Sequence, residues 1–326
     1  MDTTTTAITV TDGATAALGS LAPAVEAAQG YAAGAFAPKT LEAYRAQWTA
    51  FVAWASEHGL EPLPAAPSTI ALYLADRAKA GRKVATLALA LASIVAAHRR
   101  ADHPSPRSSR VVREVWAGIR RDLGVAQRRA APAVVDEIRA MVDALPATLS
   151  GQRDRALLVL GFAGAFRRSE IVALDVADLA FTTDGLVVTV RRSKTDQVAA
   201  GETVGLPYGA NPATCPVRSV RAWLDAAGIV EGVAFRSVDR HGRVGGALDG
   251  RDVARIVKRS AEGAGLDASG YSGHSLRAGL ATTAATVGKG DRAIMRQGRW
   301  RSRAMVDRYV REASLFRENA AGGIGL

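Results

Sequence analysis

Four side chains in the second half of the chain have types and spacings that suit chemistry on a phosphate ester. Arg167 and Glu170 stand three residues apart in GAFRRSEIVAL, and His274 and Arg277 stand three apart in GHSLRAG. Residues at that separation share one face of a helix. Cleavage of a phosphodiester requires a nucleophile, cations that hold the non-bridging oxygens, and an acid for the leaving oxygen. Arginine suits the second role because its planar fork stays charged and can grip phosphate with two bonds.

The same half supplies a lysine, a tryptophan and a tyrosine that could complete such a site. Lys194 lies in RRSKTDQ, Trp300 ends QGRW, and Tyr309 follows nine residues after Trp300. A tyrosine can form a covalent phosphoester, and its phenol needs a cationic setting to ionise. Taken singly, each residue has a structural explanation as a surface cation, a core aromatic or a capping group. Their order and spacing together favour a site, with Tyr271, three residues before His274, as the rival nucleophile.

The charge of the chain indicates a polyanionic partner. The sequence has 42 Lys and Arg against 31 Asp and Glu, a formal net charge of +11. Between His98 and Arg129 it carries nine arginines and three acids. A solvated helix face could have this composition, but a surface that follows DNA phosphates explains so uneven a distribution better. The candidates for that surface are Arg99, Arg100, Arg107, Arg110, Arg120, Arg121, Arg128 and Arg129.

Several other classes of protein are disfavoured by patterns that the sequence lacks. Cys215 is the only cysteine, which argues against a disulfide framework and a thiolate metal site. No HExxH pattern occurs, and GKG at 288–290 lacks the rest of a phosphate-binding loop, so we expect no metal and no cofactor. The longest apolar run, at 84–97, is too short to span a bilayer, and the N-terminus does not resemble a signal peptide. We therefore expect a cytoplasmic protein without a membrane partner.

In the first half of the chain, the pattern of apolar residues predicts a small helical domain at 37–126. The segment before it, at 1–36, is expected to be flexible and could hold one short helix at 14–29. A helix from Thr40 that ends before Gly59 is predicted because apolar residues recur there at helical spacing. The expected core-facing stripe of this helix consists of Leu41, Tyr44, Trp48, Phe51 and Ala55. Further helices are expected at 67–80, 84–100 and 109–123.

The second half predicts a larger domain at 134–326, joined to the first by a linker at 127–133. Alternating apolar residues at 185–207 predict a hairpin or small sheet, which would carry Lys194. We therefore predict a mainly α protein of two domains, an all-α bundle followed by an α+β domain with a small antiparallel sheet. The helices expected in the second domain lie at 134–144, 151–164, 214–227, 249–263, 275–287, 291–297 and 303–316.

The order of the candidate residues resembles that of the tyrosine recombinases, or phage integrases, a family of site-specific DNA recombinases. That family carries an Arg in a G-x-R-x-S-E-like box, a Lys on a β-hairpin, an H-x-x-R motif, and a His or Trp nine residues before a nucleophilic Tyr. The resemblance covers about 150–315 and favours Arg167 over Arg168, because Ser169 and Glu170 then take the family's places. The helical first domain resembles the family's SAM-like core-binding domain. The matching positions are Arg167, Lys194, His274, Arg277, Trp300 and Tyr309.

The resemblance implies a mechanism for strand cleavage. Tyr309 would attack a DNA phosphodiester and form a 3′-phosphotyrosyl link, while Lys194 would protonate the freed 5′ oxygen. Arg167 and Arg277 would hold the non-bridging oxygens. Because the phosphoester retains the energy of the bond, neither metal nor ATP would be required.

The supporting residues have implied roles as well. His274 would assist proton transfer, and Glu170 would position a basic neighbour. Trp300 would form a wall of the pocket. Because Trp cannot transfer a proton as the commoner His can, the role of general acid would fall more heavily on Lys194 and His274.

The resemblance also implies how the protein would assemble. The family acts as a tetramer that holds two duplexes of double-stranded DNA at specific recombination sites and exchanges strands through a Holliday junction. We therefore expect DNA and further copies of this chain as partners, with accessory DNA-bending proteins possible and the nucleoid as the location. The tail beyond Tyr309, with Leu315 and Phe316, would dock on a neighbouring protomer or pack on its own domain. The alternatives are a type IB topoisomerase that relaxes supercoils and a non-catalytic DNA-binding protein.

Overall fold

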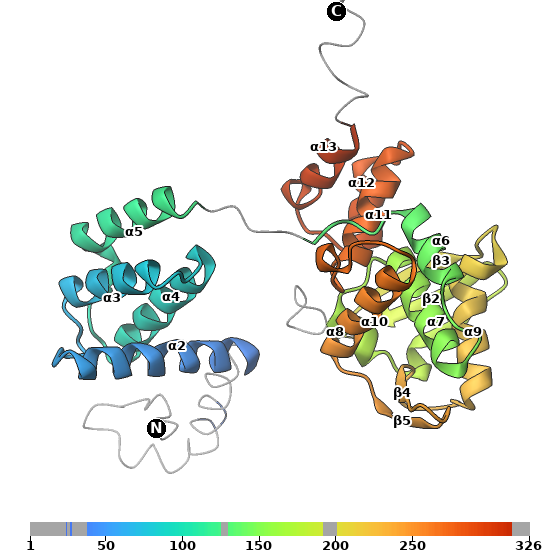
Figure 1. The fold of residues 1–326 in the computed structure, drawn as a ribbon, viewed down its shortest axis with the longest axis horizontal. Helices are drawn as coiled ribbons and strands as arrows, with labels where there is room; N and C mark the ends of the chain where they lie inside the picture. Colours follow the sequence, from blue (N-terminus) through green and yellow to red (C-terminus); the bar gives the residue numbers. More distant parts are fainter. Residues whose placement is uncertain (1–23, 25–26, 28–37, 125–129, 192–200, 315–326) are drawn as a thin grey trace, which may run out of the picture. The chain divides into compact units, whose positions relative to one another are not determined.

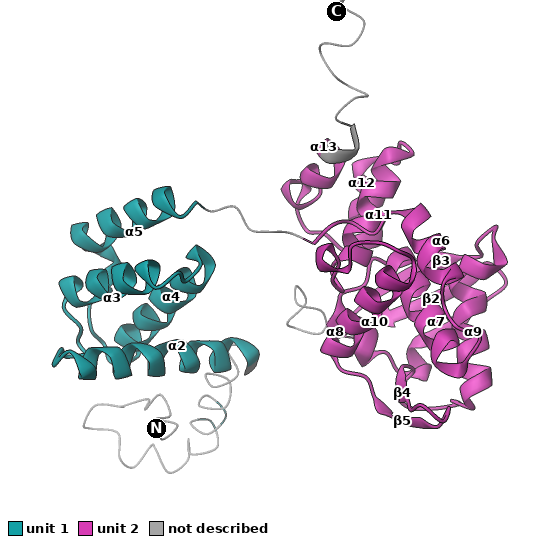
Figure 2. Ribbon diagram, in the orientation of Figure 1, with its two compact units in different colours: residues 1–127 teal, residues 128–326 magenta. Residues whose placement is uncertain are grey.

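The computed structural model describes residues 24, 27, 38–124, 130–191 and 201–314. Of these, residue 38 and residues 312–314 are described by their backbone alone. The chain forms two compact units, Met1–Gln127 and Arg128–Leu326, which we call unit 1 and unit 2 (Figures 1 and 2). None of the helices in the described part is long and apolar enough to cross a membrane. The predicted fold class is confirmed, since helices dominate both units and unit 2 adds small antiparallel sheets. Lys194, Arg128, Arg129, Leu315 and Phe316 lie outside the described residues, as does the helix expected at 14–29 except for residues 24 and 27, which are helical.

Unit 1 is a bundle in which α2 packs along α4 and α3 packs along α5 (Figure 1). From residue 38 to residue 124, its elements are α2 (Pro38–Glu57), α3 (Pro67–Lys79), α4 (Val84–Arg100), the 3-10 turn η1 (Pro106–Ser108) and α5 (Arg110–Asp122).

The core of unit 1 uses a face of α2 that differs in part from the predicted stripe. Phe51 is buried as expected, but Trp54 is buried too, although it stood outside the stripe. The reason is Tyr73 of α3, whose ring lies 5.1 Å from that of Phe51 and 5.2 Å from that of Trp54. Ala55 is also buried, whereas the earlier members of the stripe are only half-buried: Leu41, Tyr44 and Trp48.

A buried histidine fastens the connection between α2 and α3 to α4. His98, in the last turn of α4, is 1% exposed. Its Nε2 accepts a hydrogen bond from the backbone N–H of Ala65 at 3.0 Å, so its Nδ1 carries the proton and donates to Ile94 O at 2.8 Å. This histidine therefore has a structural role in its neutral form.

Unit 2 is built around α7 (Leu149–Ala163), which packs against α9 (Pro216–Ala227), α11 (Ser275–Thr286) and several shorter elements. The run from Ala156 to Leu160 in α7 is entirely buried, as expected for a helix that is apolar on all sides. The remaining helices are α6 (Val135–Asp143), α8 (Arg168–Ala173), α10 (Gly250–Gly263), α12 (Asp291–Gly298) and α13 (Asp307–Ser314). The 3-10 turns are η2 (Val176–Asp178), η3 (Pro212–Thr214), η4 (Ala268–Gly270) and η5 (Arg303–Met305).

The hairpin predicted at 185–207 is confirmed. Strands β2 (Gly185–Val190) and β3 (Glu202–Pro207) pair antiparallel, with Val188 opposite Val204 and Val190 opposite Glu202. The sequence analysis missed a third strand, β1 (Leu179–Phe181), which pairs with β2 to give the order β1-β2-β3. It also missed α8 and a second hairpin formed by β4 (Arg236–Val238) and β5 (Val244–Ala247).

One predicted helix is wrong in extent. In place of a helix over 303–316, the chain forms the 3-10 turn η5 and then begins α13 at Asp307. A small separate core, formed where α11, α12 and α13 meet, explains this arrangement, because Val306 is fully buried there between the two elements. Trp300 and Tyr309 belong to the same small core, so the packing of these three helices positions both aromatic rings.

Candidate active site

The turn between α7 and α8 places Arg167 and Glu170. Glu170 accepts hydrogen bonds from the backbone N–H of Arg167 at 2.9 Å and from its guanidinium at 2.5 Å, and so caps the start of α8. Ala165, just before, adopts a left-handed conformation with φ of 46° while fully buried. Gly164 must lack a side chain, since a Cβ there would lie 2.0 Å from the ring of Phe166.

The start of α11 places His274 and Arg277. His274 is the N-cap residue of the helix, and Arg277 lies in its first turn with only 2% exposure. The Arg277 Nη1 donates to Ala165 O at 2.5 Å, and its guanidinium lies 4.3 Å above the centre of the Trp300 ring. Its Nη2 is buried and has no hydrogen-bond partner among the described residues. Burial, followed by the charges of Arg167 and Arg299, lowers the pKa of Arg277 to about 9.

The lowered pKa, and an Nη2 without a partner among the described residues, show that the surroundings of Arg277 disfavour its positive charge. A buried cation whose charge is disfavoured, and which keeps one N–H without an acceptor, is stabilised more by an incoming anion than a solvated arginine is. The surroundings of Arg277 therefore favour an oxyanion such as phosphate next to Nη2.

The hydroxyl of Tyr309 lies beside a histidine and an arginine. The phenol oxygen is 3.2 Å from Nε2 of His274 and accepts a hydrogen bond from Nη2 of Arg308 at 2.9 Å. Burial lowers the pKa of His274, and the charges of Arg277 and Arg308 lower it further. The imidazole is thus neutral at pH 7, and the tautomer with its proton on Nδ1 can take the phenol proton at Nε2.

The rival tyrosine has a different environment. Tyr271 is buried in the main core of unit 2, not in the small core that holds Tyr309. Burial first, and then a hydrogen bond and the charge of Glu137, raise the pKa of Tyr271 to about 12. These surroundings oppose its ionisation and so favour Tyr309 as the candidate nucleophile.

Two arginines of this region were not among the candidates from the sequence. Arg299 is 7% exposed, and its guanidinium binds Glu170 Oε2 at 2.7 Å. Arg308 packs its guanidinium 4.7 Å from the centre of the Tyr309 ring as well as binding its hydroxyl. The only signal in the sequence is that each directly precedes a predicted site residue, Trp300 or Tyr309.

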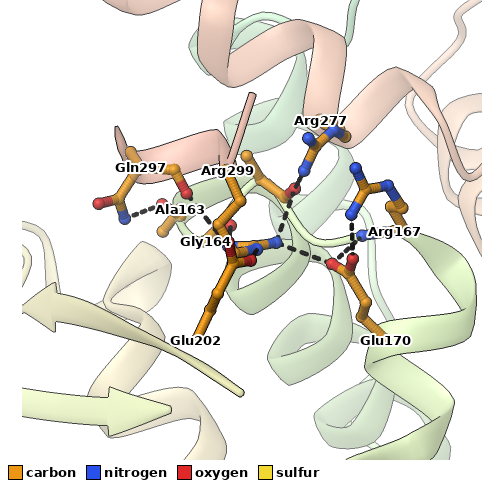
Figure 3. A network of polar contacts seen from close by, with 9 residues as sticks. Ala163, Gly164, Arg167, Glu170, Glu202, Arg277, Gln297 and Arg299 are labelled. Carbon is orange, nitrogen blue, oxygen red and sulfur yellow. Dashed lines mark hydrogen bonds and ion pairs between the residues drawn. The ribbon is translucent and has the colours of Figure 1, made fainter. Parts of the chain in front are cut away.

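The structure brings most of the predicted site residues together. A chain of contacts links Arg167, Glu170, Arg299, Ala165 and Arg277. Figure 3 shows the four charged side chains of this chain close together. From Arg277 the contacts continue through Trp300, whose ring centre lies 6.0 Å from that of Tyr309, and from Tyr309 to His274. Lys194 is not among the described residues, so its place in the site remains a prediction.

The candidate DNA-contacting arginines that the structure describes are all exposed on unit 1. They belong to the last turn of α4, to η1 and to the two ends of α5. Their surroundings leave their charges accessible to solvent, as phosphate contacts require. They are Arg99, Arg100, Arg107, Arg110, Arg120 and Arg121.

Comparisons with known proteins show which family the chain resembles over most of its length. The Phage integrase family model matches residues 134–315, and the model described as Phage integrase, N-terminal SAM-like domain matches residues 32–102. An integrase/recombinase XerD homologue of Selenomonas ruminantium is 39% identical over 289 residues, covering 87% of this chain and 84% of the relative. Recombinase Cre of Escherichia phage P1 is 25% identical over 298 residues, covering 85% of each protein.

Solved structures share the fold. A lambda integrase fragment, seen as a dimer bound to a COC′ core site, matches with a TM-score of 0.57 at 19% identity, over 84% of this chain and 89% of that one. A lambda integrase tetramer bound to a Holliday junction matches with a TM-score of 0.56 at 19% identity, over 84% and 72% of the two chains. The chain therefore belongs to the phage integrase family of tyrosine recombinases. It is an enzyme of site-specific DNA recombination.

Proposed function

We propose that this recombinase cleaves DNA by attack of Tyr309 on a backbone phosphodiester. The observation that supports this best is the pair of contacts at the Tyr309 hydroxyl, with His274 Nε2 at 3.2 Å and Arg308 Nη2 at 2.9 Å. A base and a cation at one phenol oxygen are what a tyrosine needs to act as a nucleophile. The bond from Oη to phosphorus forms, the bond from phosphorus to the 5′ oxygen breaks, and the product is a 3′-phosphotyrosyl link with a free 5′-hydroxyl.

Protons and charges balance through the neighbouring side chains. The phenol proton passes to Nε2 of His274, and the leaving 5′ oxygen takes a proton from Lys194, as the family resemblance implies. The non-bridging oxygens bind Arg277, whose Nη2 lacks a partner among the described residues, and Arg167, which is held by Glu170. Trp300 supports Arg277 by lying under its guanidinium.

Rejoining reverses these steps with the hydroxyl of a partner strand as the nucleophile. Because the phosphotyrosyl bond retains the energy of the original bond, the reaction requires neither ATP nor a metal ion. The strands exchange through a Holliday junction in a tetramer that holds two duplexes of cytoplasmic, nucleoid-associated DNA. The lambda integrase tetramer on a Holliday junction supports this assembly by likeness of fold.

We assign the parts of the chain accordingly. Residues 37–126 form the DNA-binding domain, whose exposed arginines contact the phosphates, and residues 134–326 form the catalytic domain after a linker at 127–133. Specific recognition of the site would add base contacts and readout of DNA shape, with accessory DNA-bending proteins possible.

The test is a nicked suicide substrate, drawn from DNA that flanks the gene, on which cleavage cannot be reversed. With EDTA present, the wild-type protein should give a protein–DNA adduct that survives denaturation. Tyr309→Phe should bind the DNA equally well and give no adduct, whereas Tyr271→Phe, the matched control, should give the wild-type amount. Loss of the adduct in Tyr271→Phe and its survival in Tyr309→Phe would refute the assignment. Relaxation of supercoils without joining of two sites would indicate a topoisomerase activity instead.

A further inference from the structure

Arg299 is buried in the site but has no role in the steps of strand cleavage proposed above. It ends α12 in a left-handed conformation, with φ of 55°. Glycine is the residue that adopts this conformation readily, and a long side chain is disfavoured there. The presence of arginine at such a position, with its side chain buried, indicates that the side chain itself is needed.

The two terminal nitrogens of the Arg299 guanidinium are occupied by protein acceptors. Its Nη1 donates to Gly164 O at 3.0 Å and to Gln297 O at 3.1 Å. Its Nη2 donates to Glu170 Oε2 at 2.7 Å and lies 3.4 Å from Ala165 O (Figure 3). Its buried Nε has no hydrogen-bond partner among the described residues and faces the Glu202 carboxylate at 3.8 Å, so only its two terminal nitrogens are occupied. Arg299 therefore acts on its neighbours, not on a bound phosphate.

Two of those acceptors also hold the arginines that are proposed to bind the phosphate. Glu170 gives its other oxygen, Oε1, to Nη1 of Arg167. The carbonyl of Ala165 accepts from Nη1 of Arg277. Arg299 thus contacts the anchor of each phosphate-binding arginine, although it lies 129 residues from Glu170 along the chain.

The net charge of this arginine–glutamate group suggests what the contacts of Arg299 contribute to catalysis. Arg167 and Arg299 are ion-paired with the buried carboxylate of Glu170, Arg277 adds a third positive charge nearby, and Arg299 also faces Glu202, so each arginine of the group bears on its small net positive charge. A phosphodiester has one negative charge, and attack by a phenolate gives a pentacoordinate phosphorus with two. Without Arg299, the carboxylate of Glu170 would offset Arg167, and the group would have one positive charge fewer to stabilise the transition state. Stabilisation of charge that develops in the transition state is a large part of catalysis.

We propose that Arg299 is a positioning residue of this active site. It offsets the charge of Glu170 and fixes the Ala165 carbonyl, so that Arg167 and Arg277 together stabilise the transition state for strand cleavage. The inference rests on the proposed function, since it assigns a role within the same phosphoryl transfer.

The experiment compares Arg299→Gln with the double variant Arg299→Gln/Glu170→Gln, which removes one positive and one negative charge and so restores the net charge of the wild-type group. The measured quantities are the rate of adduct formation in a single turnover with full-length protein, the Kd for intact DNA and the unfolding temperature. Arg299→Gln should slow adduct formation about 100-fold while Kd changes only a few-fold, because the effect falls on the transition state. The double variant should form the adduct at least about tenfold faster than Arg299→Gln does. Arg292→Gln, which removes an exposed charge from α12, is the control and should leave the rate unchanged.

Each outcome decides the proposal. A purely structural role of Arg299 predicts a double variant that is slower than, or equal to, Arg299→Gln, and this result would overturn the inference. A wild-type rate in Arg299→Gln would overturn it as well. If Arg299→Gln does not fold, Arg299→Lys, which keeps the charge but lacks the fork, replaces it. Slowing of about tenfold at unchanged Kd then supports the inference, and a wild-type rate overturns it. Absence of any adduct in the wild-type protein would instead be a failure of the proposed function.

Discussion

Protonation of His274 should strongly slow cleavage by Tyr309, because the neutral imidazole is the group in position to accept the phenol proton. The two side chains approach to 3.2 Å, within the range expected for a general base and its acid. Burial lowers the pKa of His274 below its ordinary value of 6.5, and Arg277 and Arg308 add to this effect. The neutral base therefore predominates at pH 7, and it becomes protonated only as the pH falls through a pKa that lies below 6.5.

The expected loss of rate follows from the role of His274 as general base. A positioned general base contributes about 100-fold to 10,000-fold in rate. At about 1.4 kcal/mol for each factor of ten, this is on the order of 3–5 kcal/mol of the barrier. His274→Ala should lose that amount, but not all activity, since Arg308 would still donate to the phenol oxygen.

The assay is the single-turnover rate of adduct formation on the suicide substrate, measured from about pH 5 to about pH 8, the range in which histidine titrates. The wild-type rate should be level near neutrality and should fall in acid with a midpoint below 6.5. Arg308→Gln removes one of the charges that lower this pKa, so its midpoint should move to higher pH. An acid limb that persists in His274→Ala, or a wild-type midpoint above 6.5, would refute the reasoning.

Two further predictions concern the packing of the site and the DNA surface. In Gly298→Ala the new Cβ would lie 1.8 Å from Cζ3 of Trp300, so we expect a decrease of about 1–3 kcal/mol in the free energy of unfolding and little remaining adduct formation. Gly290→Ala, whose Cβ would meet no atom within 4 Å, is the control, and equal behaviour of the two variants would contradict this. Replacement of Arg120 and Arg121 by Gln should reduce the slope of log affinity against log salt by about one unit for each DNA phosphate that these side chains neutralise, and an unchanged slope would exclude them from the interface.

Much of the fold follows from local pattern. The expected helix at 84–100 has the observed bounds of α4, and the hairpin at 185–207 is present as β2 and β3. Helical spacing and strand alternation are properties of neighbouring residues, so the sequence shows them directly. The elements that were missed are short: α8, β1 and the pair β4–β5 have too few residues to show a period. The helix expected over 303–316 was wrong because the burial of Val306 depends on α11 and α12.

For the site, the sequence by itself determined which residue types were present and in what order, including the nine-residue spacing from Trp300 to Tyr309. It also placed a basic stretch, from His98 to Arg129, ahead of the half that carries the candidate chemistry. Only the tertiary structure decided which arginines are buried and what they bind. Arg299 contacts Gly164 across 135 residues of chain, and His274 contacts Tyr309 across 35. Burial and electrostatic partnership arise from packing between distant segments, so no local pattern distinguishes Arg299, which binds Glu170, from Arg301, which lies in solvent two residues later.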